Sequence, residues 1–151
     1  MNNPPIAHFD TECYPNYWLL KILDQWGNVY AFEIRNGASL SVTERQRIYT
    51  IFELFTVVSF NGINYDVPMI GGALVGFDTS QLKALNDRII VDKVKHWELG
   101  VSDWKPEDHI DLMEVAPGQG SQKQYAGRIH CKKMQDLPYD PATILTDEQM
   151  M

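Results

Sequence analysis

Residues 56–70 read TVVSFNGINYDVPMI, and this stretch decides the fold class that the sequence predicts. Its first five residues are apolar and rich in β-branched side chains, as in a strand buried on both faces of a sheet. Asn61 and Gly62 then form a turn. Residues 66–75 predict a short helix, whose first turn tolerates Pro68. A buried strand that leads through a turn into a helix is typical of α/β proteins.

The residues before this stretch predict three antiparallel strands and one helix. Residues 6–12 form a short apolar stretch that ends in acidic residues. Residues 17–23 and 29–34 are rich in aromatic and β-branched side chains. Residues 24–28 (DQWGN) have the composition of a hairpin turn. Residues 41–44 (SVTE) match a capping box, in which a serine and a glutamate cap the first turn of a helix. The helix that follows has one apolar face, formed by Ile48, Ile51, Phe52 and Phe55.

The second half of the chain predicts further helices. Thr79 or Ser80 caps a helix over residues 81–94, and residues 121–129 form another. We therefore expect a single α/β domain over residues 1–151, with a mixed sheet flanked by helices. Ligands of such sheets bind where strands end and the chain turns into a loop or helix.

Composition and charge narrow the class of protein. Thirteen basic and 20 acidic residues give a net charge of −7, which argues against a broad basic face for nucleic acid. The same charge is compatible with an enzyme that meets phosphates through bound divalent cations. The two cysteines have neither metal-ligand nor disulfide-framework spacing, and no apolar run has the length of a membrane helix. We expect a cytoplasmic protein with no membrane partner.

Asp10 and Glu12 form the first candidate site. In a strand, residues two apart lie on the same face, so the two carboxylates are neighbours. Neighbouring carboxylates repel each other and need a shared cation, a shared proton or full solvation. Mg²⁺ and Mn²⁺ take oxygen ligands and suit this pair. The alternative is a strand end that becomes polar and solvated.

Asp66 is the second candidate. It follows the turn after the buried strand and lies near the first turn of the next helix. Its backbone is therefore fixed, and its side chain can point over the edge of the sheet. The alternative is that Asp66 only caps the helix before Pro68.

Together these segments resemble the first two motifs of the ribonuclease-H-like 3′–5′ exonucleases with an Asp-Glu-Asp-Asp metal site. Such domains occur in phage and family-B-like DNA polymerase proofreading exonucleases. Their F-D-x-E motif is matched by Phe9, Asp10 and Glu12. Their second motif, F-N-x-x-x-(Y/F)-D-x-P-x-(I/L), is matched by Phe60, Asn61, Tyr65, Asp66, Pro68 and Ile70. Residues 109–113 (HIDLM) resemble a later stretch of these domains.

The resemblance implies a ribonuclease-H-like mixed sheet whose first three strands are antiparallel. It also implies that Asp10, Glu12 and Asp66 are catalytic and bind two Mg²⁺ or Mn²⁺ ions. The expected activity is hydrolysis of phosphodiester bonds at nucleic-acid 3′ ends, in DNA proofreading or processing during replication. Single-stranded DNA ends are the expected partner.

The resemblance gives further residues a role. Asn61, Tyr65 and Thr11 would shape the site or contact the 3′-terminal nucleotide. Asp111 would be a supporting residue, and the alternative for Asp111 is a solvated acid at the end of an element.

One motif of the family pattern is absent from the chain. It is a helix reading Y-x-x-x-D or H-x-x-x-D, whose aspartate is the fourth metal ligand. Four residues after Tyr125, His130 and Tyr139 the sequence has Ile129, Met134 and Thr143. We therefore expect a domain truncated at its C-terminus, with weak or no activity alone, unless a polymerase or a C-terminal fragment supplies the helix. The alternative, from a different class, is a non-catalytic ribonuclease-H-like binding or assembly module.

Overall fold

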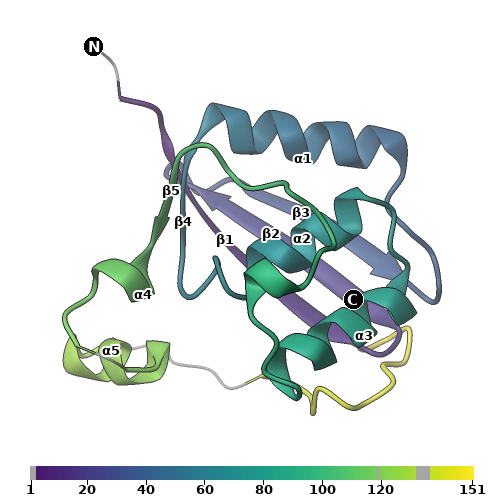
Figure 1. Cartoon of the computed structure of the whole chain (residues 1–151). Helices are drawn as coiled ribbons and strands as arrows, with labels where there is room; N and C mark the ends of the chain where they lie inside the picture. The colour runs from purple at the N-terminus through teal and green to yellow at the C-terminus, as the bar shows by residue number, and fades with distance from the viewer. Residues whose placement is uncertain (1–2, 119, 132–136) are drawn as a thin grey trace.

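A five-stranded mixed sheet in the order β3-β2-β1-β4-β5 forms the centre of the computed structural model, which describes residues 3–118, 120–131 and 137–151. β1 pairs with β2, and β2 with β3, in antiparallel fashion, whereas β4 is parallel to both β1 and β5 (Figure 1). The expected α/β class and the three antiparallel strands are confirmed. The strands are β1 (Ile6–Tyr14), β2 (Tyr17–Asp24), β3 (Val29–Arg35), β4 (Thr56–Ser59) and β5 (His109–Asp111).

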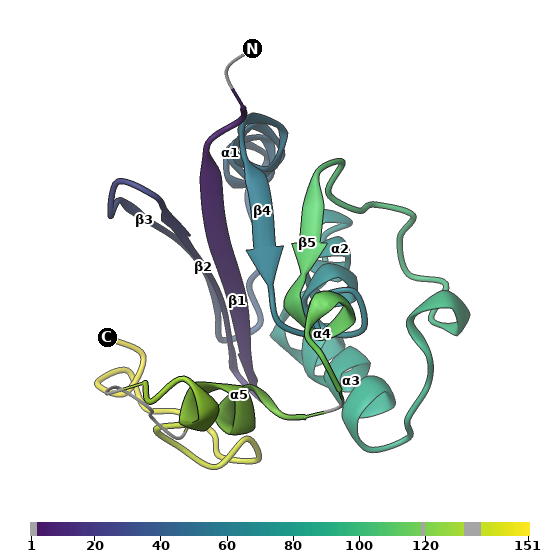
Figure 2. The same cartoon turned by 90° about the vertical axis from the view of Figure 1, so that its left-hand side faces the viewer.

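Three longer helices cover one face of this sheet. Figure 2 shows α2 and α3 on one side of β1 and the C-terminal segment on the other. The described part of the chain has no helix with the length and apolar character needed to cross a membrane. The helices are α1 (Val42–Leu54), α2 (Asp66–Leu74), α3 (Thr79–Ile90), α4 (Leu112–Val115) and α5 (Gln122–Arg128), with a short 3₁₀ turn η1 (His96–Glu98).

The capping signals in the sequence predict the start of α1 correctly but assign the wrong cap to α3. The capping box of α1 is confirmed, because the Ser41 hydroxyl accepts a hydrogen bond from the Glu44 amide. The prediction that Thr79 or Ser80 caps α3 is wrong, because the Asp78 carboxylate caps it and the Thr79 hydroxyl accepts from the Gly37 amide. α3 also ends at residue 90 rather than 94, and the chain reaches a left-handed backbone conformation at residue 93 (φ 59°), which a helix cannot contain.

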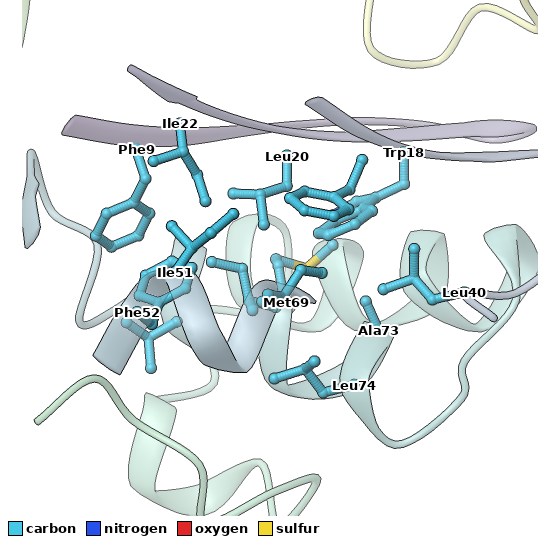
Figure 3. Packing of buried hydrophobic residues seen from close by; sticks show 14 of the residues in the cluster. Phe9, Trp18, Leu20, Ile22, Leu40, Ile51, Phe52, Met69, Ala73 and Leu74 are labelled. Atoms are coloured by element: carbon cyan, nitrogen blue, oxygen red, sulfur yellow. The ribbon is translucent and has the colours of Figure 1, made fainter. Parts of the chain in front are cut away.

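The main hydrophobic core lies between the sheet and these helices. On β2, every second side chain points toward the helices, and Trp18, Leu20 and Ile22 are fully buried. They pack against apolar side chains of α1 and α2, among them Phe52 and Met69 (Figure 3). Each buried side chain of this size contributes about 1.5–3 kcal/mol, so this layer fixes the frame that holds the site.

A smaller cluster covers part of the opposite face of the sheet. Tyr17 and Leu19 of β2 pack there against Leu145 and Met150 of the C-terminal segment. Asn16 anchors that segment, because its side-chain amide donates to the Leu145 carbonyl and accepts from the Leu145 amide, both at 2.9 Å. Residues 137–151 therefore lie on the face of the sheet that the three longer helices leave uncovered.

Candidate functional site

The candidate site lies where β1 extends past the end of β4. β4 pairs with β1 from Ile6 to His8, whereas β1 continues along β2 as far as Tyr14. After β4 the chain turns into α2, which begins at Asp66. The Asp66 carboxylate accepts hydrogen bonds from the Thr11 backbone amide at 2.9 Å and from the Thr11 hydroxyl at 2.5 Å. The Asp66 carboxylate thus accepts a hydrogen bond from a backbone amide at the edge of β1, where a neighbouring strand would otherwise pair.

Asp10 and Glu12 lie on the face of β1 that points away from the main core. Asp10 is exposed and Glu12 half-buried, whereas Thr11 between them is buried. The prediction that the two carboxylates share a face is therefore confirmed. Asp66 reaches the same stretch of β1 from its free edge, through Thr11.

A cavity of about 320 Å³ opens beside these residues, within the size range of small-molecule sites. It is walled by β1, by the end of α3 and by residues of the C-terminal segment. Its lining consists of Asp10, Thr11, Glu12, Cys13, Tyr14, Tyr65, Asn86, Ile90, Leu137 and Pro141.

The surroundings disfavour the ionised form of all three carboxylates. Burial raises the pKa of Asp66 to about 7, the hydrogen bonds from Thr11 oppose this rise, and the charge of Asp10 adds to it. Desolvation by the surrounding protein atoms raises the pKa of Asp10 although Asp10 keeps contact with solvent, and it raises the pKa of Glu12 together with the charge of Asp10. A cation shared by such groups would relieve both the desolvation and the mutual repulsion.

Asp111 holds the loop that precedes Asp66. It is buried, and its carboxylate accepts hydrogen bonds from the backbone amides of Asn61 at 2.7 Å, Ile63 at 3.0 Å and Met113 at 3.0 Å. The alternative interpretation of Asp111 as a solvated acid is therefore wrong. Its hydrogen bonds connect β5 to the loop between β4 and α2, so Asp111 fixes the position of α2 relative to the sheet.

Asn61 and Tyr65 have defined places in the same loop. Asn61 adopts a left-handed backbone conformation (φ 60°), which asparagine tolerates better than most residues. Its side-chain oxygen accepts a hydrogen bond from the side-chain amide of Asn64 at 2.8 Å. The Tyr65 hydroxyl donates to the Asn86 side chain at 2.7 Å, so α3 fixes one wall of the cavity. The alternative interpretation of Asp66 as a helix cap is also wrong, because Tyr65 is the N-cap residue of α2 and the Asp66 carboxylate accepts hydrogen bonds from Thr11.

Sequence reasoning missed two residues of this region, Asn86 and Lys21. Asn86 comes from α3, and only the tertiary structure brings it to Tyr65. Lys21 lies directly opposite Asp10 in the pairing of β1 with β2. The hairpin turn predicted for residues 24–28 could have shown this register, because the turn sets which residues of two strands face each other.

The three carboxylates have the ligand chemistry of a divalent-cation site, but in the structure they do not surround a common position. Within residues 3–118, 120–131 and 137–151, no three His, Cys, Asp or Glu side chains form a group that could hold a metal ion. The donors are nevertheless all carboxylate oxygens, which suit Mg²⁺ and Mn²⁺. Coordination of one ion by all three carboxylates would therefore require side-chain rotation, whereas both hydrogen bonds from Thr11 go to the same Asp66 oxygen, Oδ1.

The fold and site define an α/β domain with a mixed sheet and an acidic edge on β1. No protein-family model matches the chain, and neither a curated protein nor a solved structure matches it significantly.

Proposed function

We propose that the chain is a ribonuclease-H-like 3′–5′ exonuclease domain that depends on Mg²⁺ or Mn²⁺. The observation that carries the proposal is the position of Asp10, Glu12 and Asp66. These three side chains come from two motifs far apart in the sequence, and all lie on or beside the same stretch of β1. The mixed sheet with antiparallel first strands supports the ribonuclease-H-like assignment.

In the proposed reaction, residues of the chain hold the cations and the end of the substrate. Bound divalent cations would activate water and stabilise the leaving 3′ oxygen of the phosphodiester. Asp10 and Glu12 would hold them from the face of β1, and Asp66 from its edge. Tyr65, fixed by Asn86, would form the wall of the cavity against which the 3′-terminal nucleotide lies.

The proposed activity of the chain alone is weak. In the whole sequence, no Tyr or His is followed four residues later by Asp, so the fourth carboxylate of the family pattern has no counterpart. We propose that a polymerase or another polypeptide supplies this helix and that single-stranded DNA ends are the substrate.

Digestion of single-stranded DNA tests the proposed function. With Mn²⁺ and protein in excess over a 5′-labelled oligonucleotide, we expect a ladder of products that shorten from the 3′ end. Asp10→Asn is expected to slow the reaction by about 100-fold, because it removes a carboxylate that holds the cation. Asp103→Asn, the same change at an exposed loop residue, is expected to have no effect. The absence of Mn²⁺-dependent shortening, or equal shortening by Asp10→Asn, would contradict the proposal.

A second candidate function is a non-catalytic ribonuclease-H-like binding or assembly module. The observation that favours it is that, within the described residues, Asp10, Glu12 and Asp66 do not form a group that could hold a metal ion. For such a module, millimolar Mn²⁺ should leave the melting temperature unchanged. A bound cation would raise it.

A further inference from the structure

A second hollow, on the side of the sheet opposite the main core, shares Asp10 with the cavity described above. We call it the β1–β2 groove. It has a volume of about 380 Å³, and its lining includes His8, Asp10, Lys21, Phe60, Leu112 and Gln122. Asp10 therefore lines both hollows. A chain-like ligand that is bound beside Asp10 and is longer than one monomer can therefore extend into both hollows.

Lys21 is placed to bind an anion in this groove. It lies directly opposite Asp10 in the β1–β2 pairing, and its side chain is exposed. Among the described residues that line the groove, Lys21 is the one permanent cation. In the described part of the chain its ammonium group belongs to no salt bridge.

The surroundings of the groove also offer an aromatic surface. The Phe60 ring lines the groove and lies 5.9 Å from the Tyr125 ring of α5, measured between centroids. The Arg128 guanidinium lies over the Tyr125 ring, 5.5 Å from its centroid. Aromatic rings beside a cation are the elements that bind single-stranded nucleic acid without sequence preference.

We propose that the β1–β2 groove binds the nucleic-acid strand on the 5′ side of the reacting bond, with Lys21 contacting a phosphate oxygen. The proposal rests on the proposed exonuclease function. The cavity is lined by β1, α3 and the C-terminal segment and would hold the chain end, whereas the groove extends from Asp10 to Gln122 of α5 and would hold the continuing strand. In a chain of net charge −7, a phosphate needs a local cation, and lysine binds phosphate as a point charge.

A purely structural role for Lys21 makes a different prediction. Lys21 lies opposite Asp10, and its positive charge favours the ionised form of the nearby Glu12. If this were its role, removing the positive charge would strengthen Mn²⁺ binding at the carboxylates and leave the affinity for DNA unchanged. If Lys21 contacts the strand, the same change strengthens or preserves Mn²⁺ binding but weakens DNA binding.

The affinity for a short oligonucleotide distinguishes the two roles. We would measure the anisotropy of a 5′-fluorescein, phosphorothioate-linked dT octamer with Mn²⁺ over a range of salt concentrations, because this probe resists cleavage. Lys21→Gln is expected to weaken binding about fivefold and to lower the slope of log Kd against log salt by about 0.7, as for one lost phosphate contact on a single strand. Lys21→Arg is expected to keep the affinity. Arg47→Gln, the same charge change on α1 across the sheet, should bind like the parent chain.

The outcomes separate this proposal from the proposed function. Unchanged binding by Lys21→Gln, an equal loss in Arg47→Gln, or no binding by the parent chain would overturn the groove proposal. If DNA binding depends on Lys21 but no digestion occurs, the exonuclease function fails, and the groove stands only as a binding site for single-stranded DNA. If digestion depends on Asp10 but the affinity for DNA does not change in Lys21→Gln, the groove proposal is wrong and the proposed function stands.

Discussion

Asp66→Asn is expected to make the metal-free chain more stable, and the gain should grow with pH. The carboxyl group is buried, and its pKa in the folded chain is about 7, against 3.8 as the ordinary value. Because the folded-state pKa is raised, the folded chain loses stability as the pH rises from about 4 to about 7. Asparagine does not titrate, and its oxygen can still accept both hydrogen bonds from Thr11. We expect a gain of about 2 kcal/mol at pH 5 and about 4 kcal/mol at pH 8.

Urea unfolding of parent and variant at several pH values measures this effect. Asp111→Asn is the matched control, because Asp111 is equally buried but accepts three backbone hydrogen bonds with its two oxygens. The amide group of asparagine would face one of these donors, so this variant should lose about 2–3 kcal/mol. An Asp66→Asn variant that is less stable than the parent chain at pH 8 would contradict the account of Asp66 as a poorly compensated buried carboxylate.

Gly62→Ala is expected to destabilise the chain by about 3 kcal/mol, near the upper end for overpacked sites. A Cβ atom at Gly62 would lie 2.2 Å from the Ser59 Oγ and 2.6 Å from the Ser59 Cβ. Ser59 belongs to β4, which is paired on both sides and cannot move aside easily. The strain should therefore displace the loop that leads to Asp66. Thermal and urea unfolding would measure the loss.

Two further variants test the cause of this loss. Gly127→Ala in α5 adds the same methyl group where a Cβ meets no described atom within 4 Å, so it should be neutral or gain up to about 1 kcal/mol. Ser59→Gly removes both clashing atoms, so Gly62→Ala should cost much less in that background. An equal cost with and without Ser59 would show that the clash is not the cause.

Local patterns were enough to predict most of the fold. The first three strands were predicted from their composition, and α1 from the capping box at Ser41. These signals, and the turn at residues 24–28, each depend on residues close in sequence. β5 has three residues, which is too short for a period of two to appear, so the sequence does not mark it as a strand. Its pairing with β4 follows from contacts about 50 residues apart, which no local pattern encodes.

The sequence motifs name the residues of the candidate site, but they do not predict how these side chains are arranged relative to one another. The two motifs gave Asp10, Glu12 and Asp66 because strand and turn positions are readable from sequence. That Asp66 hydrogen-bonds to Thr11, 55 residues away, depends on how far β1 extends past β4. The role of Asp111 in holding the loop likewise depends on the parallel pairing of β5.

Calorimetric titration with Mn²⁺ tests the central claim, that Asp10, Glu12 and Asp66 form a divalent-cation site. Because cation binding requires ionised Asp66, whose pKa is about 7, we expect affinity to rise from pH 6 to pH 8. Titrations at pH 6 in two buffers of different ionisation enthalpy should show release of about one proton. Asp10→Asn should abolish the binding heat. No Mn²⁺ binding by the parent chain, or an identical titration for Asp10→Asn, would contradict the claim.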